Sequence, residues 1–182
     1  MNSSAALTAA TIQPGHYDID PGRSAVTFRT RHLFGLAPVR GTFAIRRGAV
    51  DIDPARPSGD SGIYAEIDTA SFHTSNPIRN QAVLSRRFLD ARTYPVITFS
   101  STQLDQAAGV IEGNLTVQGT ARPVRLSVTS AVTSGPSLTA TAVTRVDRYE
   151  FGIARARGLA GRYLTLTVTV ECAHRAEGRG HG

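Results

Sequence analysis

Apolar and polar side chains alternate with a period of two along most of this chain. Thr27 separates Val26 from Phe28, for example, and threonines separate the aliphatic residues of the last such segment. This alternation is typical of a β-strand that buries one face. Threonine is frequent at the outward positions, where its β-branched side chain suits a pleated surface. In chain order, the alternating segments are 26–32, 39–46, 63–69, 96–101, 111–118, 124–128, 138–146 and 164–171.

One segment breaks this alternation and predicts a helix. The apolar residues between Asn76 and Tyr94 are spaced roughly as successive helical turns would place them. Asn76 is a preferred N-cap residue, and Pro77 then occupies the first helical position. Tyr94-Pro95 returns the backbone to an extended conformation. The sequence therefore predicts a short helical insert around residues 77–92, between strands.

About eight strands and one helical insert in a chain of 182 residues favour an all-β fold, an eight-stranded antiparallel barrel. Closure of the barrel removes exposed strand edges, and a barrel of this size holds either side chains or one ligand. We expect the barrel to occupy residues 16–174, between a disordered leader of residues 1–15 and a flexible tail of residues 175–182. A filled barrel and a β-sandwich fit the same alternation and stay open here.

Charge and composition narrow the classes of partner. The formal net charge is +6, and all 20 basic residues are arginine. They are scattered rather than clustered in a run, so we expect no nucleic acid partner. No apolar run approaches the roughly 20 residues that cross a bilayer, so we expect no stable membrane insertion. The N-terminus lacks a basic segment followed by an apolar one, which predicts a cytoplasmic protein.

The single cysteine, Cys172, ends an alternating segment. One cysteine excludes an intramolecular disulfide bond. We expect a buried, unreactive thiol.

Several short segments, in a fixed order over residues 16–173, carry a family resemblance. They are Tyr17-Asp18-Ile19-Asp20-Pro21, Ser24-Ala25-Val26-Thr27-Phe28 with His32, Val39-Arg40-Gly41-Thr42-Phe43, Ile67-Asp68 with Ser71 and Thr74, Asn76 with Arg79, Phe88-Leu89-Asp90, Tyr94-Pro95, Ile97-Thr98-Phe99-Ser100-Ser101-Thr102, Gly113-Asn114-Leu115-Thr116-Val117-Gln118-Gly119, Arg122-Pro123-Val124, Asp147-Arg148 and Phe151-Gly152-Ile153. No piece is specific alone, but their order and spacing are. Together they resemble the YceI-like family of lipid-binding proteins.

The resemblance implies a lipocalin-like barrel with an elongated interior that accepts an amphiphilic lipid. A polyisoprenoid, an isoprenoid quinone or a fatty-acid derivative would fit, and no catalytic cofactor is implied. Many family members are periplasmic and some are dimers, so a homodimer stays open. The chain departs from the family's frequent Arg-Asp-x-His-Leu pattern, because Asn80 and Ala82 replace the acidic residue and the histidine. Arg23 stands where an early histidine is usual.

Candidate ligand-binding residues follow from the apolar faces and from this resemblance. For every apolar candidate, packing in a filled core is the alternative role. His32, on the predicted inward face, would hydrogen-bond a head group, or be a buried imidazole tied to a neighbour such as Asp68. Arg79 would pair with a phosphate or carboxylate, or anchor the insert to Asp90 or Glu66. The apolar candidates are Phe28, Phe43, Ile45, Phe72, Phe88, Tyr94, Phe99, Leu115 and Phe151.

Binding, carriage or storage of a lipid is the first functional hypothesis. The second is an isomerase or cyclase that uses the same cavity, with His32 and either Asp68 or Arg148 supplying acid–base chemistry. The third is a stress-response or interaction module with a filled interior. The other histidines do not cluster with further ligands, so we expect no metal site. The chain also lacks a Gly-x-Ser-x-Gly motif and a phosphate-binding loop, and we expect a protein that is not an enzyme.

Overall fold

The computed structural model describes residues 12–32, 37–53, 62–157 and 159–175. Strands dominate this part of the chain, and the helices are short. The helical segments are α1 (Pro77–Leu84) and the 3₁₀ helices η1 (Thr69–Ser71) and η2 (Arg148–Phe151). The strands are β1 (Gly15–Ile19), β2 (Ala25–His32), β3 (Ala37–Ile52), β4 (Ile63–Asp68), β5 (His73–Thr74), β6 (Val96–Asp105), β7 (Val110–Val117), β8 (Thr120–Ser134), β9 (Ser137–Asp147) and β10 (Tyr163–His174).

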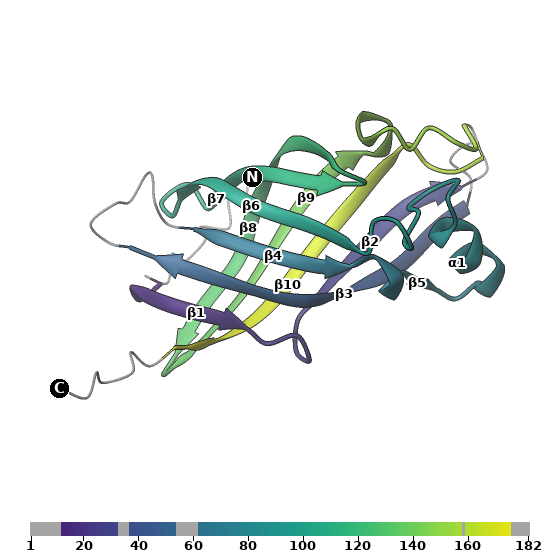
Figure 1. Ribbon diagram of the computed structural model, residues 1–182. Helices are drawn as coiled ribbons and strands as arrows, with labels where there is room; N and C mark the ends of the chain where they lie inside the picture. The colour runs from purple at the N-terminus through teal and green to yellow at the C-terminus, as the bar shows by residue number, and fades with distance from the viewer. Residues whose placement is uncertain (1–11, 33–36, 54–61, 158, 176–182) are drawn as a thin grey trace, which may run out of the picture.

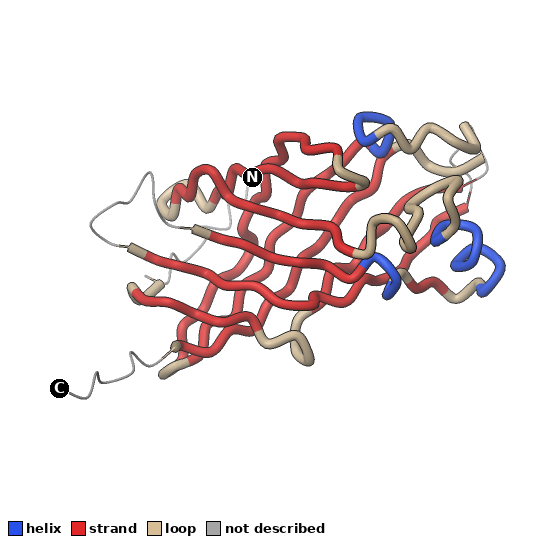
Figure 2. Tube along the Cα trace, in the orientation of Figure 1, coloured by secondary structure: helices blue, strands red, loops and turns tan. Residues whose placement is uncertain are grey.

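Eight of these strands form a closed antiparallel barrel, as predicted (Figures 1 and 2). Seven of its neighbouring pairs run in the order β10-β2-β3-β4-β6-β7-β8-β9. The barrel closes because β10 also pairs with β9 along its whole length, from Tyr163–Asp147 to Ala173–Ser137. Among the described strands, closure leaves no long edge open for pairing with another chain.

The short strands β1 and β2 occupy the same row of the barrel, one after the other. Both lie between β3 and β10, with β1 at the end of the row where Tyr17 pairs with His174 and β2 beside residues 165–169 of β10. Ser24 joins the two segments, since its Oγ accepts a hydrogen bond of 3.0 Å from the Glu171 amide. The alternation predicted β2 but not β1, which is too short to show a period.

Three β-bulges change which residues of a strand face inward. Register shifts occur between Ile45 and Arg47 in β3, between Ser101 and Gln103 in β6, and between Val128 and Ser130 in β8. A bulge adds one residue to one strand and so reverses the parity of the face beyond it. In β3, for example, Ile45 is buried before the bulge and Val50 is buried after it. These strands therefore extend beyond their predicted ends, where the simple alternation fails.

The predicted helical insert lies between β4 and β6. Asn76 is the N-cap of α1 and accepts a hydrogen bond of 3.0 Å from the Arg79 amide, with Pro77 at the first helical position, as predicted. The helix ends at Leu84, and hydrogen-bonded turns form the rest of the insert. Asn80 fixes α1 to β5, because its Oδ1 accepts from the Thr74 amide at 2.8 Å and from the Thr74 hydroxyl at 2.6 Å.

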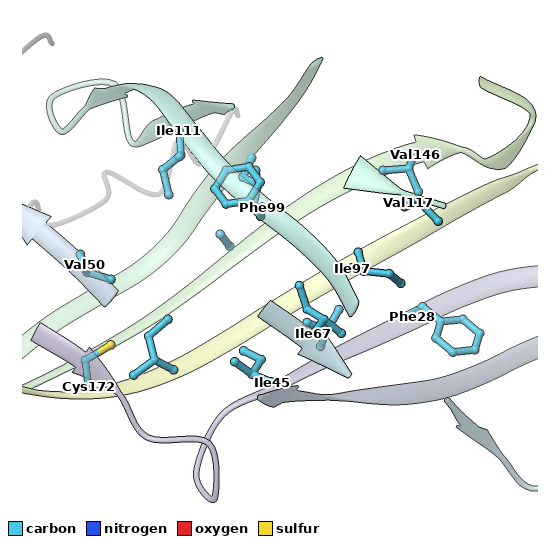
Figure 3. Close-up of a cluster of buried hydrophobic side chains, with 14 of the residues drawn as sticks. Phe28, Ile45, Val50, Ile67, Ile97, Phe99, Ile111, Val117, Val146 and Cys172 are labelled. Atoms are coloured by element: carbon cyan, nitrogen blue, oxygen red, sulfur yellow. The ribbon is translucent and has the colours of Figure 1, made fainter. Parts of the chain in front are cut away.

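The connections gather at two ends of the barrel. The end at which β4, β7 and β9 finish carries η1, α1 and η2, and we call it the α1 end (Figure 1). The opposite end carries β1 and the β6–β7 and β8–β9 turns. Buried apolar side chains run between the two ends, from Phe28 to Cys172 (Figure 3). Within the described residues, no helix is long and apolar enough to cross a membrane.

Both predicted terminal segments lie largely outside the described residues, which begin at residue 12 and end at residue 175. Arg175, the first residue of the predicted tail, donates to both carboxylate oxygens of Asp18, at 2.9 and 2.6 Å. The strand pairing starts at Gly15, which pairs with Ile52.

Candidate functional site

The inward face of the barrel is identified by residues that pair directly across neighbouring strands. Leu166 of β10 pairs with Phe28 of β2 on one side and with Thr144 of β9 on the other. Directly paired residues point to the same face of a sheet, and both partners of Leu166 are buried, at 3% and 8% exposure. The side chain of Leu166 therefore points into the barrel, and so do those of Leu164, Val168 and Val170, two residues apart along the strand.

These inward aliphatic side chains keep solvent-accessible surface. Leu164, Leu166, Val168 and Val170 are all only partly buried, whereas Val26, which pairs with Val168, is buried. Further strands show the same behaviour at Leu115, Val124 and Val128. A side chain inside a close-packed core loses nearly all of its accessible surface. The partial exposure therefore indicates that the interior is less tightly filled beside these residues than beside their buried neighbours.

Small residues on the inner face hold aromatic rings against the barrel wall. A Cβ atom on Gly41 would lie 2.5 Å from the ring of Phe28, and one on Gly113 would lie 2.7 Å from the ring of Phe99. Such contacts are impossible for any other residue, so each ring covers a glycine of the neighbouring strand. Both phenylalanines consequently lie along the wall.

Three aromatic rings meet near the α1 end. Phe28 and Phe72 are stacked, with ring centroids 5.3 Å apart and an angle of 16° between their planes. Phe43 completes the cluster, at 5.8 Å from Phe28 and 5.3 Å from Phe72. Phe72 directly follows η1. Asp68 fixes the start of that 3₁₀ helix, because its side chain accepts a hydrogen bond from the Ala70 amide. The structure thus brings together three of the predicted apolar site residues.

The other predicted apolar residues are distributed over the barrel and its connections. Ile45 and Phe99 are buried on the inner face, and Leu115 is partly buried beside Phe99, its partner in β7. Phe151 is buried in η2, outside the strands, and Phe88 is partly buried in the turns after α1. Tyr94 is 38% exposed and lies just before β6.

Two polar candidates lie at the α1 end. His32 is the last residue of β2 and pairs with Ala37, but its side chain lies outside the described part of the structure. Arg79 is partly buried in the first turn of α1. Its suggested anchors are not supported: Glu66 bonds Arg47 at 2.5 Å instead, and the described residues contain no ion pair between Arg79 and Asp90. Arg79 therefore has no acidic partner in the described structure.

Asp147 and Arg148 organise the connection between β9 and β10. Arg148 is buried and donates to three backbone carbonyls, those of Gly161 at 2.7 Å, Ile153 at 2.5 Å and Ala160 at 3.0 Å. Asp147 accepts from the Tyr149 amide at 2.9 Å and from Arg162 at 2.7 Å.

Hydrogen bonding and burial also shift the pKa values of these two side chains. The hydrogen bond from Arg162 holds the pKa of Asp147 below its ordinary value, and burial lowers the pKa of Arg148. Both side chains brace the connection that follows β9. The acid–base roles suggested for Arg148 and Asp68 therefore compete with structural hydrogen bonds that these residues already make.

The aliphatic face of β10 was not among the predicted site residues. Its alternation with threonine is visible in the sequence, but the alternation by itself does not distinguish a lining face from a packed one. The pairing of β10 with β2 on one side and β9 on the other shows that this face points into the barrel. Within the described ranges, no group of three His, Cys, Asp or Glu side chains is arranged to hold a metal ion.

Comparisons with known proteins agree with this architecture. Residues 17–173 match the YceI-like domain. A UPF0312 protein of Pseudomonas savastanoi pv. phaseolicola is 33% identical over 130 residues, covering 69% of this chain and 67% of that protein. Protein YceI of Salmonella arizonae is 33% identical over 124 residues, covering 66% and 64%. The aligned region thus spans about two thirds of each relative.

Solved structures share the fold. BcnA of Burkholderia cenocepacia superimposes with a TM-score of 0.71 at 23% identity, over 84% of this chain and 98% of that one. A polyisoprenoid binding domain from Saccharophagus degradans, implicated in plant cell wall breakdown, gives a TM-score of 0.63 at 13% identity, over 87% and 98%. At these identities the likeness concerns the fold alone.

Proposed function

Because the chain belongs to the YceI-like domain family, we propose that its barrel binds a long-chain amphiphilic lipid in the interior and carries or stores it. The ligand class is a polyisoprenoid, an isoprenoid quinone or a fatty-acid-like lipid. The likeness to the polyisoprenoid binding domain from Saccharophagus degradans supports this choice of class.

The observation that carries the proposal is the partial exposure of the inward face of β10. Four aliphatic side chains on that face, from Leu164 to Val170, keep accessible surface although their cross-strand partners Val26 and Phe28 are buried. An apolar chain lying against them would remove this surface from water. The gain is about 0.8 kcal/mol for each buried methylene, so four isoprene units contribute on the order of 10 kcal/mol before ordering costs.

Polar groups for a lipid head group lie at the α1 end. Arg79 has no acidic partner in the described structure, and a guanidinium binds phosphate or carboxylate with two parallel hydrogen bonds. His32 ends β2 at the same end of the barrel. We therefore place the head group near Arg79 and the tail along β10, past the cluster of Phe28, Phe43 and Phe72.

The proposal is tested by native mass spectrometry of the full chain, purified without detergent, and by extraction of the protein into organic solvent. We expect a bound prenyl or acyl species. After removal of that lipid, the protein should take up a fluorescent prenyl or acyl probe. A folded, delipidated protein that takes up neither probe contradicts the proposal.

A matched pair of variants tests where the lipid binds. Val168→Phe adds a ring on the inward face, whereas Thr169→Phe adds the same ring at the next residue, which is exposed. Val168→Phe should lower probe affinity at least about tenfold, because the ring occupies space that the chain needs. Thr169→Phe should leave the affinity unchanged. Equal effects of both substitutions would rule out the face of β10 as the binding surface.

A further inference from the structure

Positive charge is concentrated at the α1 end of the barrel. The two long connections at this end, residues 69–95 and 148–162, contain eight arginines and two acidic residues. Their net charge of +6 equals the formal net charge of the whole chain, so the remaining residues are neutral on balance. Figure 1 shows both connections at the same end, with α1 in one and η2 in the other.

Three arginines elsewhere on the described barrel have acidic partners. Arg23 pairs with Glu171 at 2.8 Å, Arg47 with Glu66 at 2.5 Å and Arg175 with Asp18 at 2.6 Å. At the opposite end, His16 lies between Asp18 and Asp51. These charges therefore cancel in pairs, whereas exposed wall arginines such as Arg29 and Arg125 are balanced only in the total charge of the remaining residues.

The α1 end lacks this compensation. Within the described ranges, Arg157 of these connections is exposed and lies over the ring of Tyr149, 5.2 Å from its centroid. Four more exposed arginines of the two connections have neither an ion pair nor a ring contact: Arg86, Arg87, Arg92 and Arg155. Asp147, at the start of the β9–β10 connection, is buried and already binds Arg162. Glu150 is the exposed acidic residue within this connection, against three exposed arginines there, Arg155, Arg157 and Arg162. These four guanidinium groups are thus available to an external anion.

Exposed apolar side chains accompany these arginines. Ile78 of α1 is 80% exposed, and Leu159 of the β9–β10 connection is 48% exposed. Tyr94 and Tyr163, at 38% and 44% exposure, lie at the same end. Arginine with aliphatic and tyrosine side chains is the composition of a surface that enters the head-group region of a membrane.

We propose that the α1 end of the barrel docks on the surface of an anionic lipid bilayer. The arginines contact lipid phosphates, and Ile78 and Leu159 enter the boundary between head groups and acyl chains. A nucleic acid would use the arginines but would leave both aliphatic side chains exposed to water, so the observations favour a bilayer. The proposal concerns the outer surface and goes beyond the interior ligand, because docking does not require a bound lipid.

Docking in this orientation has a structural consequence. It places the ends of β2, β4, β7 and β9 next to the bilayer, together with Arg79 and the cluster of Phe28, Phe43 and Phe72. The opposite end, where Asp18 and Asp51 lie, points away from the anionic surface. The positive charge at one end also orients the barrel as it approaches an anionic surface.

The test is sedimentation of the full chain with vesicles. One set contains phosphatidylcholine with about one third phosphatidylglycerol, which gives a strongly negative surface. The other set contains phosphatidylcholine alone. We expect binding to the anionic vesicles only, weakening as salt screens the arginines. Each arginine near such a surface contributes roughly fivefold in affinity. The quadruple variant R86Q/R87Q/R92Q/R155Q should therefore lose at least about 25-fold, even if only two of the four arginines make contact.

Matched variants separate docking at this end from an effect of total charge. R29Q/R40Q/R46Q/R125Q removes the same charge from exposed positions on the barrel wall and should retain most of the binding. Ile78→Ser with Leu159→Ser should weaken binding at high salt, whereas Val132→Ser, a 52% exposed residue near the opposite end, should not. Equal losses from both quadruple variants, or no vesicle binding by the unmodified protein, would overturn the proposal.

Two further measurements distinguish the remaining outcomes. Binding of a DNA duplex that requires Arg86, Arg87, Arg92 and Arg155, in the absence of vesicle binding, would replace the bilayer with a nucleic acid. Uptake of the prenyl probe in solution, measured on the same quadruple variant, should be unchanged. Failure of docking and failure of interior lipid binding are therefore seen in separate assays.

Discussion

Replacement of Arg148 by alanine should destabilise the protein more than any substitution of a surface arginine. The guanidinium is buried and donates to the carbonyls of Gly161, Ile153 and Ala160, at distances between 2.5 and 3.0 Å. Alanine leaves all three carbonyls without this donor in a region that water reaches poorly. Each such loss costs about 1 kcal/mol, so the free energy of unfolding should fall by about 3 kcal/mol.

The thermal midpoint translates this loss into a measurable shift. For a chain of this size, 1 kcal/mol corresponds to roughly 2–4 °C, so Arg148→Ala should unfold roughly 6–12 °C below the unmodified protein. Arg148→Lys keeps the charge but lacks the planar set of donors, so it should recover only part of the loss. Urea unfolding followed by circular dichroism gives the free energies directly.

Arg145→Ala is the matched control, because Arg145 lies three residues before Arg148, near the end of β9, and is exposed. It only covers the ring of Tyr163, with its guanidinium carbon 4.1 Å from the ring centroid. Its loss should cost no more than about 1 kcal/mol. Equal stabilities for the Arg148→Ala and Arg145→Ala variants would refute the role of Arg148 as the organiser of the β9–β10 connection.

Three further predictions concern acid stability, wall packing and thiol reactivity. Hydrogen bonds from Arg47 and Tyr64 lower the pKa of Glu66 from 4.5 to about 2, so its stabilising contribution is complete above pH 4.5 and is lost as the pH falls toward 2. Because Arg47 is exposed, we expect this contribution to be about 1 kcal/mol. In urea unfolding, the free energy of unfolding of Glu66→Gln should match that of the unmodified protein at pH 2 and fall below it at pH 7. A constant difference across this range would contradict the pairing. Gly41→Ala should lower the free energy of unfolding by about 1–3 kcal/mol, because its Cβ would lie 2.3 Å from the His73 carbonyl oxygen and 2.5 Å from Phe28. Gly62→Ala is the control, because its Cβ would meet nothing within 4 Å. Equal unfolding midpoints for the two variants would contradict close packing at Gly41. Cys172 is 1% exposed, and this burial raises the pKa of its thiol to about 11. Iodoacetamide should therefore label the native protein far more slowly than the unfolded one. Rapid labelling in native buffer would contradict a buried thiol at Cys172.

Buried positions within the strands were easier to predict from the sequence than positions in the connections. Buried positions such as Phe28, Ile45 and Phe99 were predictable, because burial of one strand face is written locally in the period of two. Tyr94 is 38% exposed, and its position depends on the turns that follow α1, which have no period. The expected buried thiol at Cys172 is confirmed, with 1% exposure.

Local pattern by itself determined the positions of the eight longer strands and the start of α1 at Asn76-Pro77. Each of these depends on residues a few positions apart, through alternation, turn chemistry or capping, and such interactions are complete within a short segment. The family resemblance added an order of segments that no single segment carries.

Only the tertiary structure decided how distant segments meet. The bulges after Ile45, Ser101 and Val128 depend on the register with a neighbouring strand, and the inward direction of Leu166 depends on partners more than 20 residues away. The positive α1 end arises because closure of the barrel brings residues 69–95 and 148–162 to one end. A linear pattern states which face of a strand is apolar, but it does not contain the neighbours that the face will meet, and those neighbours determine both the interior surface and the distribution of charge.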